Sequence, residues 1–405
     1  MAYRGPIDPA FVQRLIDAAL PEDQELEYKR ELPRKITDPT RAAQSKADPF
    51  EEFAKDVSAM ANASGGVLLY GVAEDEKTKR PCIYPITEEP FDHAQVRLHS
   101  VLDSLIEPRL MGVTFNEVSV EGGYVLGIRV PGSLAGPHWH GKPERRRFSV
   151  RRGGRVSEYT YQELRAAFDR NASAATRARQ WMTERLASIK EGRTWRPLLP
   201  GPMTVVHIIP MLSYYQEEPP IDLRRASELA IKFPKPWMQG GYSDGINFDG
   251  YMIYQSGGEE DTELFGYTQL FRDGTMEVVR SAGPVWPTDS SDDLVGGGPI
   301  AWTVHDAVTM TPSAIRAFGK DGPLLVGASV IGTAGHALPA YGRRDHRRHV
   351  SDRDALVVPA AYVEQTDNDE ELNRVAKIAL DMIWQGFGYR SCPHYDEQGK
   401  YREEL

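Results

Sequence analysis

Cysteine is scarce in this chain, with only Cys82 and Cys392 among 405 residues. Two isolated cysteines provide neither a disulfide framework nor the paired spacing of a zinc site, and their scarcity fits a reducing cytoplasm. The N-terminal sequence MAYRGPIDPAF contains no apolar signal region. The longest apolar run, residues 322–340, is interrupted by glycines and a histidine. We therefore expect a buried strand with flanking turns there, and no membrane span.

An excess of positive charge is also missing, because the formal net charge is −10 at pH 7. A protein this acidic does not coat nucleic acid without specificity, so any nucleic-acid site has to be a local basic patch. Such a patch occurs in HWHGKPERRRFSVRRGGR, residues 138–155, where Glu144 is the single acidic residue. Its basic residues, here called the basic stripe, are Lys142, Arg145, Arg146, Arg147, Arg151, Arg152 and Arg155. They suit contacts with phosphates, and a solvated loop-and-strand face is the alternative.

Two histidines precede the stripe, His138 and His140. Two histidines at this spacing without a cysteine pair are weak evidence for a metal site. We interpret them as residues that position the backbone or contact phosphate.

The length of the chain predicts two domains, and its 40% hydrophobic content provides each with a core. The pattern predicts an α+β protein with a mixed α/β domain at residues 1–170, a helical linker at 171–199 and a second α+β domain at 200–405. The role of the second domain is unassigned, and a sensor or effector-binding role rests only on its position.

Local patterns predict the elements of the first domain. Asp8 and Pro9 start a helix, Asp92 caps another, and Thr160 with Glu163 forms a capping box for a helix through Phe168. Strands are expected at 26–29, 67–72, 113–120, 124–130 and 146–152, and a helix at 50–61. The apolar run at 67–72 predicts a central strand.

In the second domain, strands are expected at 203–211, 250–255, 263–271, 276–279, 324–332 and 355–363. A loop is expected at 281–299 and a helix at 311–318. The last helix has a predicted buried stripe of Leu372, Val375, Ala376, Ala379 and Met382.

The stretch PEDQELEYKRELP, residues 21–33, concentrates five carboxylates around a short predicted strand. Alternation places Leu26 and Tyr28 on one face and Glu25, Glu27 and Lys29 on the other. One interpretation is a solvated edge strand whose charge resists aggregation. The other is a set of carboxylates gathered to hold a metal ion. The stretch alone leaves both open.

Several motifs occur in an order that resembles the Schlafen AlbA-type domain: ELEYKREL, KDVSAMANASGGVLLYGV, GIRVPGS, GPHWH, RFSVRRGG and YTYQEL. The resemblance covers about the first 170 residues. Some members of this family resemble DNA-binding or regulatory proteins, and others are endoribonucleases that cut tRNA and rRNA with a divalent metal.

The resemblance implies site residues and a cofactor. Two glutamates with the family's five-residue spacing are Glu22 and Glu27, and Lys29 takes the place of a basic residue near the scissile phosphate. The third acid falls at Glu74, where the family usually has aspartate, with Asp75 as the alternative. Glu22, Glu27 and Glu74 are thus the expected ligands of Mg²⁺ or Mn²⁺. Such a hard cation neutralises the charge that develops on a phosphodiester during cleavage.

Two functions follow as hypotheses. The first is a metal-dependent endoribonuclease for tRNA-like structured RNA, in cellular or phage-triggered defence. A homodimer would supply the second domain copy that eukaryotic nuclease members contain. The second hypothesis is a non-catalytic DNA- or RNA-binding regulator whose C-terminal half senses a ligand. Alanine at Glu22 and Glu27 separates them, because it abolishes cleavage under the first hypothesis and leaves binding intact under both.

Overall fold

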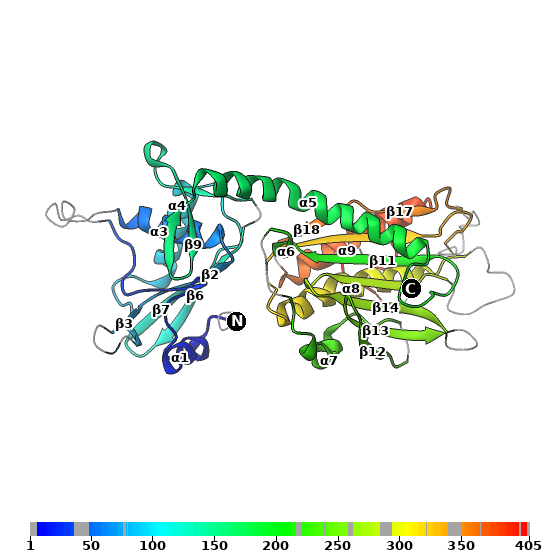
Figure 1. The fold of residues 1–405 in the computed structure, drawn as a ribbon, viewed down its shortest axis with the longest axis horizontal. Coiled ribbons are helices and arrows are strands. Elements are labelled where there is room, and N and C mark those ends of the chain that lie inside the picture. The colour runs from blue at the N-terminus through cyan, green and yellow to red at the C-terminus, as the bar shows by residue number, and fades with distance from the viewer. Residues whose placement is uncertain are drawn as a thin grey trace. The chain divides into compact units, whose positions relative to one another are not determined.

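The computed structural model describes residues 6–35, 48–75, 78, 80–133, 135–215, 220–237, 240–257, 262–283, 294–320, 322–338, 350–364, 366–396 and 398–402. Contacts divide the chain into two compact units, Met1–Ser173 and Ala174–Leu405. A single helix, α5 (Tyr161–Lys190), runs through the boundary (Figure 1). The sequence predicts a helix that ends at Phe168 and a separate one after it. No proline or glycine lies between residues 168 and 190, so nothing interrupts the helix. The predicted α+β class, with a mixed α/β domain followed by a further α+β region, is confirmed.

The described residues of the first unit form three sheets. Its elements are α1 (Pro9–Asp17), β1 (Leu26–Lys29), α3 (Pro49–Ala61), β2 (Gly65–Tyr70), β3 (Val72–Glu74), β4 (Pro81–Ile83), α4 (Phe91–Leu105), β5 (Ile106–Glu107), β6 (Thr114–Val120), β7 (Gly123–Pro131), β8 (Trp139–His140), β9 (Arg147–Arg152) and β10 (Arg155–Glu158). The main sheet has the order β1–β2–β7–β6, a second has the order β10–β9–β8–β5, and β3 pairs with β4. β1 is an edge strand parallel to β2, and β2 is central as predicted.

The alternation predicted for β1 places its apolar side chains on one face of the main sheet. Leu26 and Tyr28 pack in the core cluster that contains Phe11 and Leu15 of α1. The other face of the sheet is covered by α3 and α4 in a separate core cluster. Because neighbouring strand residues point to opposite faces, Glu27 and Lys29 face away from α1. This places a charged pair against α3.

Two of the three predicted helix starts are confirmed. The Asp8 carboxylate accepts a hydrogen bond from Phe11 N at 2.7 Å. In the capping box, Thr160 N donates to Glu163 Oε2 at 2.8 Å, and Glu163 N donates to Thr160 Oγ1 at 3.4 Å. The prediction that Asp92 caps a helix is wrong, because α4 begins at Phe91 and Pro90 occupies the cap position. Asp92 instead lies in the first turn, where a carboxylate favours the helix dipole.

The second unit is built on one large sheet. Its strands are β11 (Met203–Pro210), β12 (Ser243–Ile246), β13 (Gly250–Gly257), β14 (Glu263–Phe271), β15 (Met276–Ser281), β16 (Leu324–Ile331), β17 (Ala355–Val357) and β18 (Ala361–Val363), and its helices besides α5 are α6 (Leu212–Tyr215), α7 (Ala226–Leu229), α8 (Gly297–Ala317) and α9 (Asp369–Gly386). The strand order is β12–β13–β14–β15–β11–β16–β17, and β18 also pairs with β16. α8 and α9 pack on one face, and the C-terminal part of α5 packs on the other.

A fully buried carboxylate joins α5 to this sheet. Glu277 on β15 accepts hydrogen bonds from Arg185 Nη2 at 2.7 Å and from Tyr267 Oη at 2.8 Å. His207 Nε2 lies 2.9 Å from the same carboxylate. Burial alone raises the pKa of Glu277, but the hydrogen bonds from Arg185 and His207 bring that pKa down to about 2. The carboxylate is therefore ionised and fastens α5 to the sheet.

Three expectations for the second unit are wrong. The helix expected at 311–318 begins at Gly297, with Pro312 inside it. Burial of the apolar residues before Pro312 offsets the missing backbone hydrogen bond. The strand expected at 355–363 is split into β17 and β18 around Pro359. Met382 is 40% exposed, and Ile383 continues the buried stripe of α9 instead.

Other expectations concern residues 281–299 and the longest apolar run. Residues 284–293 of the expected loop lie outside the described residues. Residues 324–331 of the apolar run form the buried strand β16, as predicted. In the described parts of the chain, every helix is too short or too polar to cross a bilayer.

Candidate functional site

Four charged side chains form a compact cluster between β1, α3 and β9. Lys29 Nζ lies 2.7 Å from Glu27 Oε1 and 3.1 Å from Asp56 Oδ2. Arg151 Nη2 lies 2.5 Å from Glu27 Oε2. Two carboxylates are thus matched by two cations, and we call this group the charge cluster. Of the four side chains, only that of Lys29 is substantially exposed, at 32%.

The structure also brings Glu22 close to Glu27, as expected. The Glu22 Oε1 atom accepts a hydrogen bond from Tyr28 N at 2.9 Å, so the chain before β1 folds back along the strand. Burial raises the pKa of Glu22, and the charge of Glu27 adds to that effect. Burial likewise raises the pKa of Asp56, again with a contribution from Glu27. The three carboxylates are therefore electrostatically coupled.

Lys29 remains charged despite its partial burial. Burial alone lowers the pKa of Lys29, but the carboxylates of Asp56 and Glu27 outweigh it and raise that pKa above its ordinary value. The ammonium therefore stands between the two carboxylates as a permanent cation.

Asp56 was not among the predicted site residues, although the sequence contains a signal for it. It lies in KDVSAMA, inside the apolar stripe that predicts helix α3, three residues after the buried Phe53 and four before the buried Met60. A carboxylate at such a position is rarely buried without a cationic partner. That partner is Lys29.

The structure does not bring the third expected acid to this cluster. Glu74 is exposed at the end of β3, where its Cα partner is Pro81. Asp75, the alternative, accepts hydrogen bonds from Thr78 N at 2.8 Å and Thr78 Oγ1 at 2.9 Å. Across the described residues, no group of three or more His, Cys, Asp or Glu side chains is placed to hold a metal ion. Because Glu27 is already bound to two cations, the set Glu22, Glu27 and Glu74 does not fit a metal ion in this arrangement. A role for Mg²⁺ or Mn²⁺ stays a prediction.

Most of the basic stripe is exposed, and one member is not. Lys142, Arg145, Arg146, Arg147, Arg152 and Arg155 are exposed, whereas Arg151 is 2% exposed. The expectation that Arg151 belongs to an exposed surface is therefore wrong. Strand alternation explains the difference, because Arg151 points inward from β9 and its neighbour Arg152 points outward. Inside, Arg151 also donates to the carbonyl oxygen of Asp23 at 2.8 Å and to that of Leu26 at 3.1 Å.

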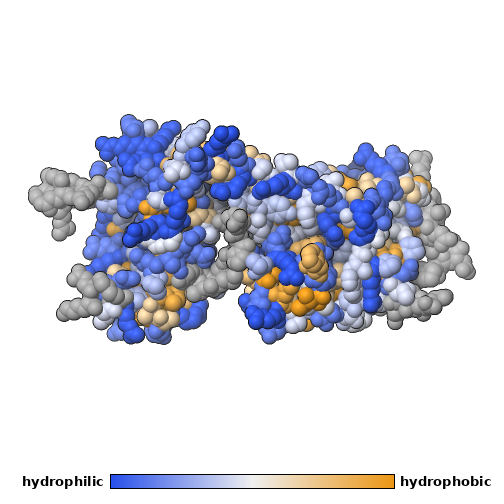
Figure 2. Space-filling model, viewed as in Figure 1, coloured by the Kyte–Doolittle hydropathy of each residue, from blue (hydrophilic) through white to orange (hydrophobic). Residues whose placement is uncertain are grey.

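Some exposed stripe residues already have acidic partners. Lys142 pairs with Asp48 and Glu51, Arg147 with Glu158, and Arg152 with Glu163. Arg145, Arg146 and Arg155 have no acidic partner within the described part of the chain. In the view of Figure 2, strongly hydrophilic residues gather over the part of the first unit that holds β9 and the start of α5. Exposed cations without acidic partners can contact phosphates without first breaking an ion pair.

The two histidines before the stripe have structural positions. His138 Nδ1 lies 2.6 Å from Pro108 O, and His140 Nε2 lies 2.8 Å from Ser149 Oγ. Burial lowers the pKa of His140 to about 4. A neutral, buried ring does not contact phosphate, so the backbone-positioning interpretation applies.

Asn62 connects this region to α3. It was not among the predicted site residues. Its Oδ1 accepts from His138 N at 2.7 Å, and its Nδ2 donates to the carbonyl oxygens of His138 and Ser149, each at 2.8 Å. Asn62 opens the sequence NASGG, which directly follows α3. It fixes β8 and β9, and thus the stripe, relative to α3.

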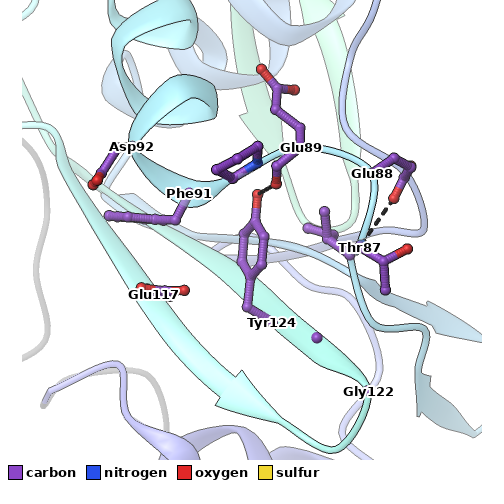
Figure 3. A pocket seen from close by; sticks show the side chains of 11 residues that line it. Thr87, Glu88, Glu89, Phe91, Asp92, Glu117, Gly122 and Tyr124 are labelled. Atoms are coloured by element: carbon purple, nitrogen blue, oxygen red, sulfur yellow. Dashed lines mark hydrogen bonds between the residues drawn. The ribbon is translucent and has the colours of Figure 1, made fainter.

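A separate open cavity of about 640 Å³ lies near the start of α4 and the β6–β7 turn. Figure 3 shows Tyr124 in it, with its hydroxyl group donating to Glu89 O at 2.8 Å. Its acidic lining residues are Glu88, Glu89, Asp92 and Glu117. An acidic lining repels phosphates, so this cavity is unsuited to phosphate contacts.

Residues 22–160 match the family described as Schlafen, AlbA_2. This region is similar to the Schlafen AlbA_2 family. The match runs from Glu22 to Thr160, so it includes the charge cluster and the basic stripe and leaves the second unit uncovered. The family indicates a nucleic-acid-binding or nuclease-like function for the domain. No curated protein matches the chain.

Solved structures with similarity to this chain include two bacterial proteins. One is the DIP2311 protein from Corynebacterium diphtheriae, at 23% identity and a TM-score of 0.24, over 36% of this chain and 25% of that chain. The other is the N-terminal domain of an ATP-dependent DNA helicase RecG-related protein from Nitrosomonas europaea. It shows 22% identity and a TM-score of 0.25, over 37% of this chain and 90% of that chain. The chain thus spans about a quarter of the length of the first of these proteins.

Proposed function

We propose that the Schlafen AlbA_2 domain binds tRNA-like structured RNA through the exposed members of the basic stripe. The observation that carries the proposal is the group of Arg145, Arg146 and Arg155, exposed and without acidic partners among the described residues of a protein with net charge −10. Contacts of this kind release counterions from the RNA backbone. They follow the backbone of a folded RNA more than its base sequence.

The charge cluster supports binding that needs no metal. Lys29 and Arg151 already neutralise Glu27, and Lys29 also pairs with Asp56. The site therefore presents one partly exposed ammonium, Lys29, which can contact a phosphate. Under this proposal the protein is a non-catalytic nucleic-acid-binding regulator, and the second unit is its ligand-sensing part.

A metal-dependent endoribonuclease is the second candidate. The coupling of the Glu22, Glu27 and Asp56 carboxylates favours it, since such a group attracts a divalent cation once Lys29 moves away. A bound Mg²⁺ or Mn²⁺ ion would supply charge neutralisation at the phosphodiester. A homodimer also stays a prediction, and sedimentation equilibrium measures it.

One experiment separates the two candidates. Purified protein is mixed with fluorescently labelled tRNA, and with a DNA duplex, in the presence of EDTA and in the presence of Mn²⁺. The first candidate predicts binding of tRNA in both conditions and intact RNA afterwards. RNA fragments that form only with Mn²⁺ would support the second candidate in place of the first. If the protein binds neither tRNA nor the DNA duplex, both candidate functions are contradicted.

A further inference from the structure

Aromatic side chains lie next to the basic stripe: they are half-buried on β8 and β9 and exposed in the first turns of α5. Tyr161 is 79% exposed and Phe168 is 49% exposed. Residues seven positions apart lie on the same side of a helix, so both rings belong to one side of α5. Trp139 on β8 lies beneath the stripe residue Arg146, whose guanidinium carbon is 4.1 Å from the ring centroid.

Strand pairing and ring contacts connect most of these aromatic side chains to one another. Trp139 and Phe148 are direct partners in the β8–β9 pair, so their side chains lie on the same face. The rings of Phe148 and Phe168 then meet edge to face, with centroids 5.9 Å apart. Aromatic rings thus extend from β8 across β9 to α5.

Charged stripe residues border these rings. Arg152 Nη2 lies 2.7 Å from the carboxylate of Glu163, which is in the same helical turn as Tyr161. Arg146, over the Trp139 ring, and Arg152, paired with α5, therefore place cations beside these aromatic rings.

We propose that this surface stacks unpaired bases, so that the domain binds single-stranded segments in preference to continuous duplex. The inference deepens the proposed function, because it depends on the stripe contacting phosphates. Proteins that hold single strands combine a cationic path for the backbone with aromatic rings on which bases stack. A duplex hides its base faces, so it gains the phosphate contacts and loses the stacking.

Tyr161 tests the inference without disturbing the fold. In the described part of the chain it makes no hydrogen bond, ion pair or ring contact. Phe168, by contrast, packs on Phe148 and helps to hold α5. Tyr161→Leu removes the aromatic face, and Tyr161→Phe keeps it, while neither changes a charge.

Fluorescence anisotropy with a labelled single-stranded oligouridine and with a duplex of the same length measures the effect. Tyr161→Leu is expected to weaken single-strand binding about fivefold or more, because loss of one stacked base corresponds to at least that factor. Duplex binding and the salt dependence of both complexes stay unchanged, and Tyr161→Phe binds as the wild type does.

The outcomes separate this inference from the proposed function. If Tyr161→Leu binds the single strand as tightly as the wild type does, the stacking surface is excluded while the stripe remains. If the wild type binds neither probe, the proposed function fails and the inference fails with it. Melting curves of the two variants confirm that both are folded.

Discussion

Arg151 Nη2 lies 2.5 Å from Glu27 Oε2, and both side chains are buried. This ion pair joins β9, in the second sheet, to the edge strand β1 of the main sheet. It gives Glu27, within the charged stretch around β1, a cationic partner in the interior of the domain. The charge of Glu27 is neutralised inside the domain, so contacts with nucleic acid have to come from the residues that remain exposed.

Removing Arg151 is expected to destabilise the first unit. Arg151→Met leaves the buried Glu27 with Lys29 as its one cationic partner and also removes the hydrogen bonds to Asp23 and Leu26. Loss of one partner of a buried ion pair costs about 3–5 kcal/mol. Urea unfolding followed by circular dichroism measures the loss. Arg152→Met is the control, since an exposed ion pair contributes about 0–1 kcal/mol. Equal losses in the two variants would contradict the assignment of Arg151 to the interior.

Removing the ammonium of Lys29 is expected to create metal binding. Lys29→Met leaves Glu27 and Asp56 facing each other without the cation between them. Mn²⁺ should then raise the melting temperature of Lys29→Met above its value in EDTA, because an ion that binds only the folded state stabilises it. The wild type and Lys35→Met, which alters an exposed lysine, should show no such gain. An equal Mn²⁺ gain in all three proteins would favour the endoribonuclease candidate.

The pH dependence of stability is expected to change in Glu22→Gln. Burial raises the pKa of Glu22 in the folded protein, so the folded state holds this proton more tightly than the unfolded state does. Its contribution to stability is present below the ordinary pKa and is lost as the pH rises through the folded value. Glu22→Gln should therefore be more stable than the wild type at neutral pH, and the difference should shrink in acid. Melting temperatures across this range measure it, with Glu25→Gln as the control. A constant difference at all pH values would show that the effect is not one of titration.

The pH dependence of stability is expected to have the opposite sign in Glu277→Gln. Despite the burial of Glu277, its pKa falls to about 2, through the hydrogen bonds from Arg185 and His207. A lowered pKa contributes stability above the ordinary value of 4.5, and this contribution is lost as the pH falls toward 2. Glu277→Gln should thus be less stable than the wild type at neutral pH, by about 3–5 kcal/mol. The gap should narrow in acid, and a gap that widens there would contradict the ionised state of Glu277.

The sequence predicts what depends on local periodicity and capping. Alternation assigns Leu26 and Tyr28 to the core, and the Thr160–Glu163 box starts α5. The sequence does not predict which charged residues of different elements form ion pairs. One partner of Glu27, Arg151, lies 124 positions away. Alternation puts Arg151 and Arg152 on opposite faces of β9 but does not say which face is inward.

The start of α8 is another feature that local rules did not give. Proline is common at the first position of a helix, and the helix expected at 311–318 has Pro312 as its second residue. Pro312 lies inside the helix because the residues before it are buried in the core of the second unit. Tertiary burial therefore outweighs the local preference there.

The most direct test of the account is the salt dependence of tRNA binding after charge reversal of the three unpaired stripe arginines. Arg145→Glu, Arg146→Glu and Arg155→Glu are combined in one protein. The control combines Arg80→Glu, Arg374→Glu and Arg390→Glu, which are exposed and change the net charge equally. The account predicts weaker binding for the stripe variant alone, with the slope of log affinity against log salt reduced by about one for each lost phosphate contact. An unchanged affinity and slope in the stripe variant, or an equal loss in the control, would contradict it.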